Sequence, residues 1–330
     1  MMNKILVLCI AALFCSSASF AKIWRVNNNG GGNGDFLTAQ AANDGPTIDG
    51  DTIHLEPSPN SYGGLTASKR LVWISTGAFL SAHPLEQYSA TAGRIDNLHS
   101  TIGSENAVYS IYISGPAYLV ASNVRLERCY LTGPISIGYS PSYGYVIANN
   151  DVVLNCYSEG YLYLYRGTNH FASNNIFGDY LYVDPTSSSI VQNNVFNITT
   201  TVPGLVSNTT LQNNIFNKAI GAYTFTNCVV QYNMSGSAGV LPAGNFNQNN
   251  VAMANVFVNN SGTNDAAFVL KAGSPAIASG YAGANMGAYG GTTPFKLSLQ
   301  PAIPAIYKIT APFVPAGSTM NVIFSTKSNN

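Results

Sequence analysis

The chain of 330 residues has little charge, with 14 Lys and Arg against 14 Asp and Glu, or 8% charged residues in all. Ordinary globular chains carry about a quarter charged residues. The net charge of zero excludes the basic patch that binding to nucleic acid requires. Long apolar runs are also missing after residue 21, so we expect no transmembrane segment in the mature chain.

Cysteine is scarce, with five residues of which two fall within the first 21. The other three, Cys129, Cys156 and Cys228, are an odd number and form no C-x-x-C pair. This argues against a disulfide framework and leaves a structural zinc site without a ligand pair. We predict small buried thiols, no metal site and no cofactor. A disulfide between Cys129 and Cys156 is the alternative.

The first 21 residues, MMNKILVLCIAALFCSSASFA, combine a basic residue, an apolar run and a small-x-small ending. This pattern is typical of a secretory signal peptide, and we predict cleavage after Ala21 and an exported mature chain. A transmembrane anchor needs about twenty apolar residues, whereas this run has ten. Attachment of lipid at Cys15 is disfavoured by the bulky Phe14 before it.

Asparagine is abundant, with 37 residues, and it recurs in a unit of an apolar residue, a spacer, one or two asparagines and further apolar residues. Seven copies follow residue 118: LVASNVRL, VIANNDVV, FASNNIFG, IVQNNVFN, TLQNNIFN, VVQYNMSG and FNQNNVAM. Spacings of 27, 25, 19, 20, 19 and 17 residues separate the anchoring asparagines, Asn123, Asn150, Asn175, Asn194, Asn214, Asn233 and Asn250. A loose period near twenty with short β-branched and aromatic runs predicts the coils of a β-solenoid.

Each coil must turn sharply, and asparagine tolerates the left-handed backbone conformation that such turns use. Stacking places the anchors about 4.8 Å apart, so we predict that their amides form one hydrogen-bonded ladder. A calcium or glycan site at this row is the alternative. Phe177, Phe196 and Phe216 each lie two residues after an anchor and should stack inside the coils. Cys129 and Cys156 each lie six residues after an anchor and should be neighbours on adjacent coils.

The repeat has an opening segment, WRVNNNGGGNGDFLTAQAANDGPTIDGDTIHLEPSPNSYGG, and a closing segment, FVLKAGSPAIASGYAGANMGAYGG. Together they resemble the secreted right-handed parallel β-helix repeat proteins of the bacterial pectin-lyase-like superfamily. The resemblance implies an all-β fold with a right-handed, single-stranded parallel β-helix over residues 22–291. A short helix with Asp35 as its N-cap is expected to cover the open end. Alternating apolar runs at 305–310 and 320–325 predict a two-strand β extension in residues 292–330.

The segment YLYLYR places Tyr161, Tyr163 and Tyr165 on one face of a strand and two leucines on the other. Tyr161 and Tyr180 each lie fourteen residues before the next anchor, and Tyr163 and Tyr182 each lie twelve before it, so we predict stacked pairs on adjacent coils. Such a flat aromatic face buries apolar area against a sugar ring while its hydroxyls bond sugar hydroxyls. The alternative is an ordinary outer strand face that aromatic pairs stabilise.

Four of the scarce charges flank these tyrosines, with Glu159 and Asp179 on one side and Arg166 and Asp184 on the other. Glycoside hydrolysis uses two carboxylates separated by roughly 5 to 9.5 Å, which makes Glu159 and Asp179 candidate catalytic residues. Surface ion pairs of these acids with Arg166 or Arg128 are the alternative.

The superfamily's enzymes carry Asn-Thr-Asp, Gly-His-Gly and Arg-Ile-Lys motifs or an acidic calcium cluster, and the sequence has none of these. His54, His83 and His99 lie in the N-terminal third, away from the tyrosines, so no general base is assigned. We therefore predict a secreted, non-catalytic glycan-binding or adhesion scaffold, whose partner is an extracellular polysaccharide or a surface glycan. The alternative is a polysaccharide lyase or glycoside hydrolase acting on an acidic extracellular polysaccharide. The predicted binding residues are Tyr161, Tyr163, Tyr165, Arg166, Tyr180, Tyr182 and Asp184.

Overall fold

The computed structural model describes residues 21–31, 33–85, 89–101, 103–199, 204–218, 223–260, 262, 264–311 and 319–328. Most of the expected signal peptide, residues 1–20, lies outside the described residues. Within the described ranges, no helix has the length and apolar character needed to cross a bilayer.

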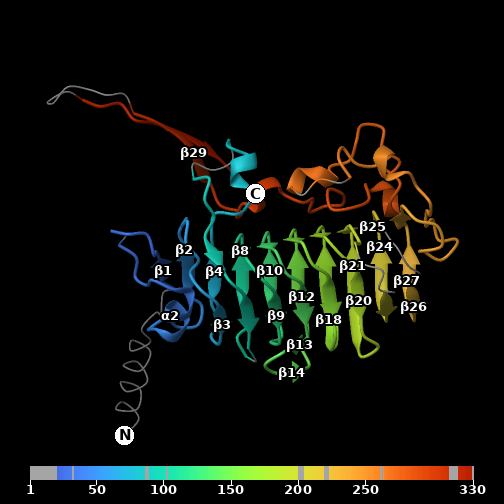
Figure 1. Cartoon of the computed structure of the whole chain (residues 1–330), viewed down its shortest axis with the longest axis horizontal. Coiled ribbons are helices and arrows are strands. Elements are labelled where there is room, and N and C mark those ends of the chain that lie inside the picture. Colours follow the sequence, from blue (N-terminus) through green and yellow to red (C-terminus); the bar gives the residue numbers. More distant parts are fainter. Residues whose placement is uncertain are drawn as a thin grey trace, which may run out of the picture.

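Parallel strands stack into three sheets and form a β-solenoid, which confirms the predicted fold class (Figure 1). Each complete coil passes from sheet A through sheet C to sheet B. Sheet A has ten strands: β1 (Ile23–Val26), β2 (Thr52–Leu55), β4 (Val72–Ile74), β7 (Ala107–Tyr109), β10 (Arg125–Glu127), β15 (Val152–Leu154), β18 (Gly167–Ser173), β21 (Ser187–Gln192), β24 (Thr209–Gln212) and β27 (Val229–Gln231).

The other two sheets have eight strands each. Sheet C contains β5 (Arg94–Ile95), β8 (Tyr112–Ile113), β11 (Tyr130–Leu131), β16 (Tyr157–Ser158), β19 (Ile176–Phe177), β22 (Val195–Phe196), β25 (Ile215–Phe216) and β28 (Met234–Ser235). Sheet B contains β3 (Leu65–Ala67), β6 (Leu98–Ser100), β9 (Ala117–Leu119), β12 (Ile135–Ile137), β17 (Leu162–Leu164), β20 (Leu181–Val183), β23 (Leu205–Ser207) and β26 (Thr224–Thr226). The short strands alternate between residues that point into the coil and residues that point out of it.

A ladder of buried asparagine amides runs along the corner between sheets A and C, as predicted for four of the anchors. Oδ1 of Asn194 accepts hydrogen bonds from the main-chain N and Nδ2 of Asn175, both at 2.9 Å. Asn214 accepts from Asn194 in the same way at 2.9 and 3.0 Å, and Asn233 accepts from Asn214 at 2.9 and 3.0 Å. In this stretch each asparagine thus donates two hydrogen bonds to Oδ1 of the asparagine on the next coil, one from its main-chain N and one from Nδ2.

The prediction of a single row is wrong for the other three anchors. Asn123 and Asn150 belong to an exposed row at the corner before sheet A, where Asn150 donates to Asn123 at 3.1 Å and Asn169 donates to Asn150 at 3.2 Å. Asn247, not Asn250, continues the buried ladder by accepting from the main-chain N of the preceding rung at 3.0 Å. Because asparagine suits the turns at both corners, the repeated motif alone does not identify the corner.

The Asn-Asn pairs divide two tasks between neighbouring residues. The first residue of each pair has the left-handed conformation, with φ of 56° at Asn174, 53° at Asn193 and 58° at Asn213. The second residue supplies the buried amide of the ladder. The predicted left-handed turn is therefore present, but it lies one residue before the ladder.

The interior of the coils holds the predicted phenylalanine column. The rings of Phe177, Phe196 and Phe216 are fully buried and stack with centroids 5.2 Å apart at interplanar angles of 15° and 16°. Their strands pair in the same register, Phe177 with Phe196 and Phe196 with Phe216. The predicted column is confirmed here because these coils have nearly equal lengths of 19 and 20 residues.

Two cysteines occupy the earlier positions of the ladder column. The register that pairs Leu154 with Ser173 carries Cys156 opposite Asn175, whose Oδ1 accepts from the main-chain N of Cys156 at 2.8 Å. Cys129 lies opposite Cys156 on the preceding coil, and both are buried free thiols. Burial raises the pKa of the Cys156 thiol, with the neighbouring Cys129 adding to the rise.

Native-state thiol labelling is expected to distinguish these cysteines. Cys228, which is partly exposed, should react in the folded protein, whereas Cys129 and Cys156 should react only after denaturation because both thiols are buried and inaccessible, and burial also raises the pKa of Cys156. Intact mass should show one label on the native mature chain and three under denaturing, non-reducing conditions. A single label after denaturation would instead reveal a disulfide.

The cap at the N-terminal end is shorter than predicted. Helix α2 (Ala39–Asp44) begins after Thr38, whose Oγ1 accepts from the main-chain N of Ala41 at 3.1 Å, so Thr38 and not Asp35 is the N-cap. Asp35 is still beside β1, where its carboxylate accepts from the main-chain N of Arg25 at 2.8 Å. The strand-like pairing of Phe36 with Val26 delays the start of the helix.

After β28 the chain turns back and crosses the outer face of sheet C (Figure 1). The described residues of this returning segment, 253–260, 262 and 264–299, carry four short 3-10 helices: η2 (Met253–Asn255), η3 (Asp265–Phe268), η4 (Tyr281–Gly283) and η5 (Leu297–Leu299). Buried residues of this segment, among them Met253, Phe268 and Leu299 of η2, η3 and η5, form a second apolar core with Ile176, Val195, Ile215 and Met234 of sheet C. The predicted domain boundary at residue 291 falls inside this segment.

Two antiparallel hairpins complete the structure. The predicted C-terminal pair is confirmed as β29 (Ala305–Thr310) and β30 (Ile323–Lys327). The other hairpin, β13 (Tyr139–Ser140) and β14 (Gly144–Tyr145), leaves the coil directly after β12. This hairpin accounts for the longer spacing of 27 residues between Asn123 and Asn150.

Candidate functional site

The predicted tyrosines lie together on the outer face of sheet B. Leu162 and Leu164 point into the coil and are buried, so Tyr163 between them points outward. β17 pairs with β20, and Tyr163 lies opposite Tyr182, so the predicted pair lies on adjacent coils. The two rings meet edge to face, with an interplanar angle of 79°, and are not stacked as predicted. The ring centroids of Tyr163 and Tyr182 are 5.4 Å apart.

The flanking tyrosines extend this contact in both directions. The ring centroid of Tyr161 lies 4.0 Å from that of Tyr163 and 5.5 Å from that of Tyr180. Tyr161 and Tyr180 are the second predicted pair. Tyr165 lies 5.0 Å from Tyr163 and 5.6 Å from Tyr182. Except for Tyr180, which is buried, these rings remain partly exposed.

The sequence interpretation missed two members of the surface, Tyr139 and Tyr145. Both belong to the β13–β14 hairpin, and both contact Tyr165, at 5.2 and 5.4 Å between ring centroids. Tyr145 is 54% exposed, which makes it the most accessible ring of the group. The run GYSPSYGY, a tyrosine-rich insertion in a long repeat, was the available signal. We define the tyrosine surface as Tyr139, Tyr145, Tyr161, Tyr163, Tyr165, Tyr180 and Tyr182.

Five hydroxyls of the tyrosine surface, those of Tyr161, Tyr163, Tyr165, Tyr180 and Tyr182, are protonated at neutral pH. Burial raises the pKa of all five above the ordinary value for tyrosine, and neighbouring tyrosine hydroxyls raise it further in Tyr161, Tyr163 and Tyr165. The hydroxyls of Tyr163 and Tyr180 are hydrogen-bonded to each other. The surface therefore offers ring faces together with neutral hydroxyl donors and acceptors.

The two charged residues predicted at one end have separate roles. The guanidinium carbon of Arg166 lies 5.1 Å from the ring centroid of Tyr145, and the side chain is exposed. Asp184 accepts hydrogen bonds from the main-chain N and Oγ1 of Thr186 at 2.9 and 2.6 Å. Arg166 therefore borders the tyrosine surface as an accessible cation, while Asp184 closes the turn after β20.

The two candidate catalytic carboxylates contact different parts of the molecule. Oε1 of Glu159 accepts from the hydroxyl of Tyr130 at 2.5 Å, on the side of sheet C. Oδ1 of Asp179 accepts from the main-chain N of Tyr180 at 3.0 Å, and Asp179 is buried. The structure brings Asp179 to the edge of the tyrosine surface and directs Glu159 toward sheet C.

One histidine is closer to this face than its position in the sequence indicates. His99 lies on β6 in the outward row of sheet B that continues through Tyr118 and Ser136 to Tyr163. Its ring packs edge-on against Tyr118 with centroids 4.8 Å apart, and burial lowers its pKa. Stacking of coils, not proximity in sequence, decides which residues share a face.

A buried histidine lies on another sheet. His170 of β18 is 1% exposed, and its Nδ1 lies 3.4 Å from Oδ2 of Asp151, which is fully buried. Both residues belong to sheet A and its preceding corner, away from the tyrosine surface on sheet B.

Among the residues that the structure describes, no three His, Cys, Asp or Glu side chains gather in a group that holds a metal ion. Comparison with known proteins gave no match to a family model, a curated protein or a solved structure.

Proposed function

We propose that the protein is an exported, non-catalytic scaffold that binds an extracellular polysaccharide or surface glycan on its tyrosine surface. The observation that carries the proposal is the continuous contact of seven tyrosine rings over two neighbouring coils and one hairpin. Partly exposed rings take the apolar faces of sugars, while their neutral hydroxyls bond sugar hydroxyls. Because the tyrosine rings follow the direction of the strands, the surface suits several sugar units of an extended polysaccharide.

Arg166 supports an acidic glycan as the ligand. Its guanidinium is exposed beside Tyr145, and a guanidinium matches a carboxylate through two parallel hydrogen bonds. The sequence pattern of residues 1–21 supports the proposal of export. The intact mass measured in the labelling experiment above also shows at which residue the mature chain begins. A mature chain that begins at Lys22 is the expected result.

Replacing both Tyr163 and Tyr182 by alanine is expected to weaken glycan binding by about 2 kcal/mol, or roughly thirtyfold, because each stacked ring contributes about 1 kcal/mol. A glycan-array screen of the mature protein identifies the ligand, and calorimetry measures the affinity. Tyr281→Ala is the matched control, since Tyr281 is exposed on the returning segment and not on sheet B. The melting temperature should fall only modestly. Unchanged affinity in the double variant would leave these tyrosines as a stabilising outer face.

Analysis of products separates binding from turnover. Glu159→Gln and Asp179→Asn should keep the affinity of the parent protein, and the bound glycan should be recovered intact. Unsaturated or shortened products that disappear in these variants would instead identify a polysaccharide lyase or glycoside hydrolase. Both acids already have hydrogen-bond partners within the fold, which favours binding without turnover.

A further inference from the structure

The outward row of sheet C changes character along the solenoid. In strand register it reads Arg94, Tyr112, Tyr130 and Tyr157, and then continues with apolar residues from Ile176 onward. The returning segment covers the apolar part. The first part of the row is covered instead by a loop that follows β4, and this loop leaves a cavity.

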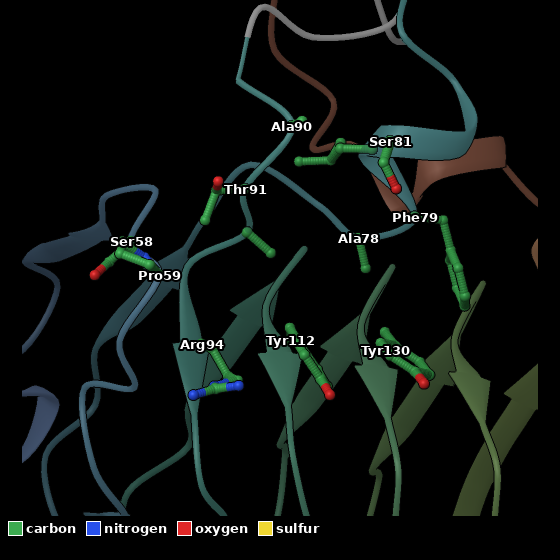
Figure 2. Close-up of a pocket in the computed structure, with 12 residues that line it drawn as sticks. Ser58, Pro59, Ala78, Phe79, Ser81, Ala90, Thr91, Arg94, Tyr112 and Tyr130 are labelled. Atoms are coloured by element: carbon green, nitrogen blue, oxygen red, sulfur yellow. The ribbon is translucent and has the colours of Figure 1, made fainter.

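The cavity has a volume of about 290 Å³. Arg94, Tyr112 and Tyr130 project from three neighbouring strands and form its floor (Figure 2). Phe79 of the loop closes one end, and the hydroxyl-bearing residues Ser58 and Thr91 line the other parts of the wall. This volume is near the lower limit of ligand pockets and fits a single ring.

Arg94 enters the cavity as a half-buried cation that has no carboxylate partner among the described residues. Its Nε is buried and has no hydrogen-bond partner. Arg25, Arg70, Arg125 and Arg128 each form an ion pair with a glutamate, whereas within the described ranges no carboxylate pairs with Arg94. A buried donor of a charged group that lacks a partner is costly, so the site is complementary to an oxyanion.

The aromatic floor beside Arg94 is held in place by its neighbours. The rings of Tyr112 and Tyr130 are stacked, with centroids 4.7 Å apart and an interplanar angle of 25°. Phe79 lies 4.7 Å from Tyr130, whose hydroxyl donates to Glu159. The guanidinium carbon of Arg94 lies 5.9 Å from the ring of Tyr112. A cation and an aromatic face are therefore offered side by side in a preformed arrangement.

The loop above the floor is held by backbone contacts at its start and by a side-chain contact at His83. The main-chain N of Gly77 donates to the carbonyl of Ser110 at 2.9 Å, and the N of Ala78 donates to the carbonyl of Ser298 at 2.9 Å. The ring of His83, after η1 (Leu80–Ala82), lies 2.8 Å from the carboxylate of Asp265. These contacts fix the cavity before any ligand enters.

We propose that this cavity binds a small molecule with one oxyanion group on a single ring. The guanidinium of Arg94 takes the oxyanion, and the face of Tyr112 takes the ring. The site is separate from the tyrosine surface, because it lies on sheet C and accepts one ring, not an extended chain. The oxyanion is a carboxylate, phosphate or sulfate, and the probes below distinguish a sugar acid, a sugar phosphate and an aryl acid.

Calorimetry of the full mature chain with glucuronate, glucose 6-phosphate and benzoate tests the proposal, with neutral glucose as the matched ligand control. At least one anion should bind at one site, and glucose should bind at least tenfold more weakly. Arg94→Gln should weaken binding of that anion at least tenfold, and Arg94→Lys should weaken it less because the charge remains. Arg70→Gln, which changes an exposed arginine outside the cavity and outside the tyrosine surface, should leave it unchanged.

Thermal unfolding separates a binding role of Arg94 from a structural one. Arg94→Gln removes a half-buried cation whose buried Nε has no hydrogen-bond partner, so its melting temperature should equal or exceed that of the parent protein. Absence of binding by all three anions, equal binding of glucose, unchanged affinity in Arg94→Gln, or a lowered melting temperature in that variant would each overturn the proposal. The tyrosine variants of the glycan test leave this site untouched, so the two proposals fail independently.

Discussion

Asn194→Ala is expected to lower the free energy of unfolding by about 3 kcal/mol, because it leaves several buried polar groups without hydrogen-bond partners. The side chain of Asn194 is fully buried. Its Nδ2 donates to the carbonyls of Ala172 and Gln192 at 3.0 and 2.9 Å and to Asn214, while its Oδ1 accepts twice from Asn175. Alanine removes all five bonds and leaves the main-chain N of Asn175 without an acceptor.

Urea denaturation followed by circular dichroism measures this loss. Asn250→Gly is the matched control, since Asn250 is exposed and has a φ of 59° that glycine adopts without strain. Its stability should stay within about 0.5 kcal/mol of the parent protein. Equal losses in the two variants would mean that the ladder adds nothing beyond the general cost of an asparagine substitution.

Phe196→Ala is expected to cost about 4 kcal/mol. The ring is fully buried between Phe177 and Phe216, so its removal opens a cavity inside the stack and also breaks two ring contacts. The neighbouring coils are held in strand register and collapse only partly into the space. Phe196→Leu, which fills more of the volume, should lose less than half as much.

The same denaturation experiment checks the phenylalanine variants. Phe246→Ala provides the comparison, because Phe246 is 70% exposed and contacts only Tyr232 among the described rings. Its loss should be below about 1 kcal/mol. If Phe196→Ala proved as mild as Phe246→Ala, the interior column would have no role in stability.

The sequence predicted best where coils have nearly equal lengths. The phenylalanine column and the pairing of Tyr163 with Tyr182 on adjacent strands follow from spacings of 19 and 20 residues, because coils of nearly equal length keep the same strand register. Prediction failed where the motif recurs at another corner of the coil. Asn150 stacks on Asn123 across the 27-residue coil, but Asn169 and not Asn175 continues this row, so the count of 25 residues from Asn150 to Asn175 joins two different corners.

The sequence repeat did not predict contacts between segments that are far apart in the chain. The returning segment has no period of its own, so its packing on sheet C does not appear in the sequence pattern. Arg94 and Tyr112 lie before the first recognised repeat, and their side-by-side placement depends on strand pairing of β5 with β8. For the same reason the carboxylate of Glu159 turned out to lie beside Tyr130, a residue of the preceding coil.

The returning segment fixes the number of coils. In a plain solenoid each repeat contacts only its neighbours, so duplication or loss of a repeat is readily accommodated. Here the segment packs on Met234 near the C-terminal end of the stack and binds Ala78 and His83 much earlier, through Ser298 and Asp265. One inserted coil between these points would separate them by about 4.8 Å. Gene duplication, the usual route by which solenoids lengthen, is thereby penalised in this protein unless the segment lengthens in step.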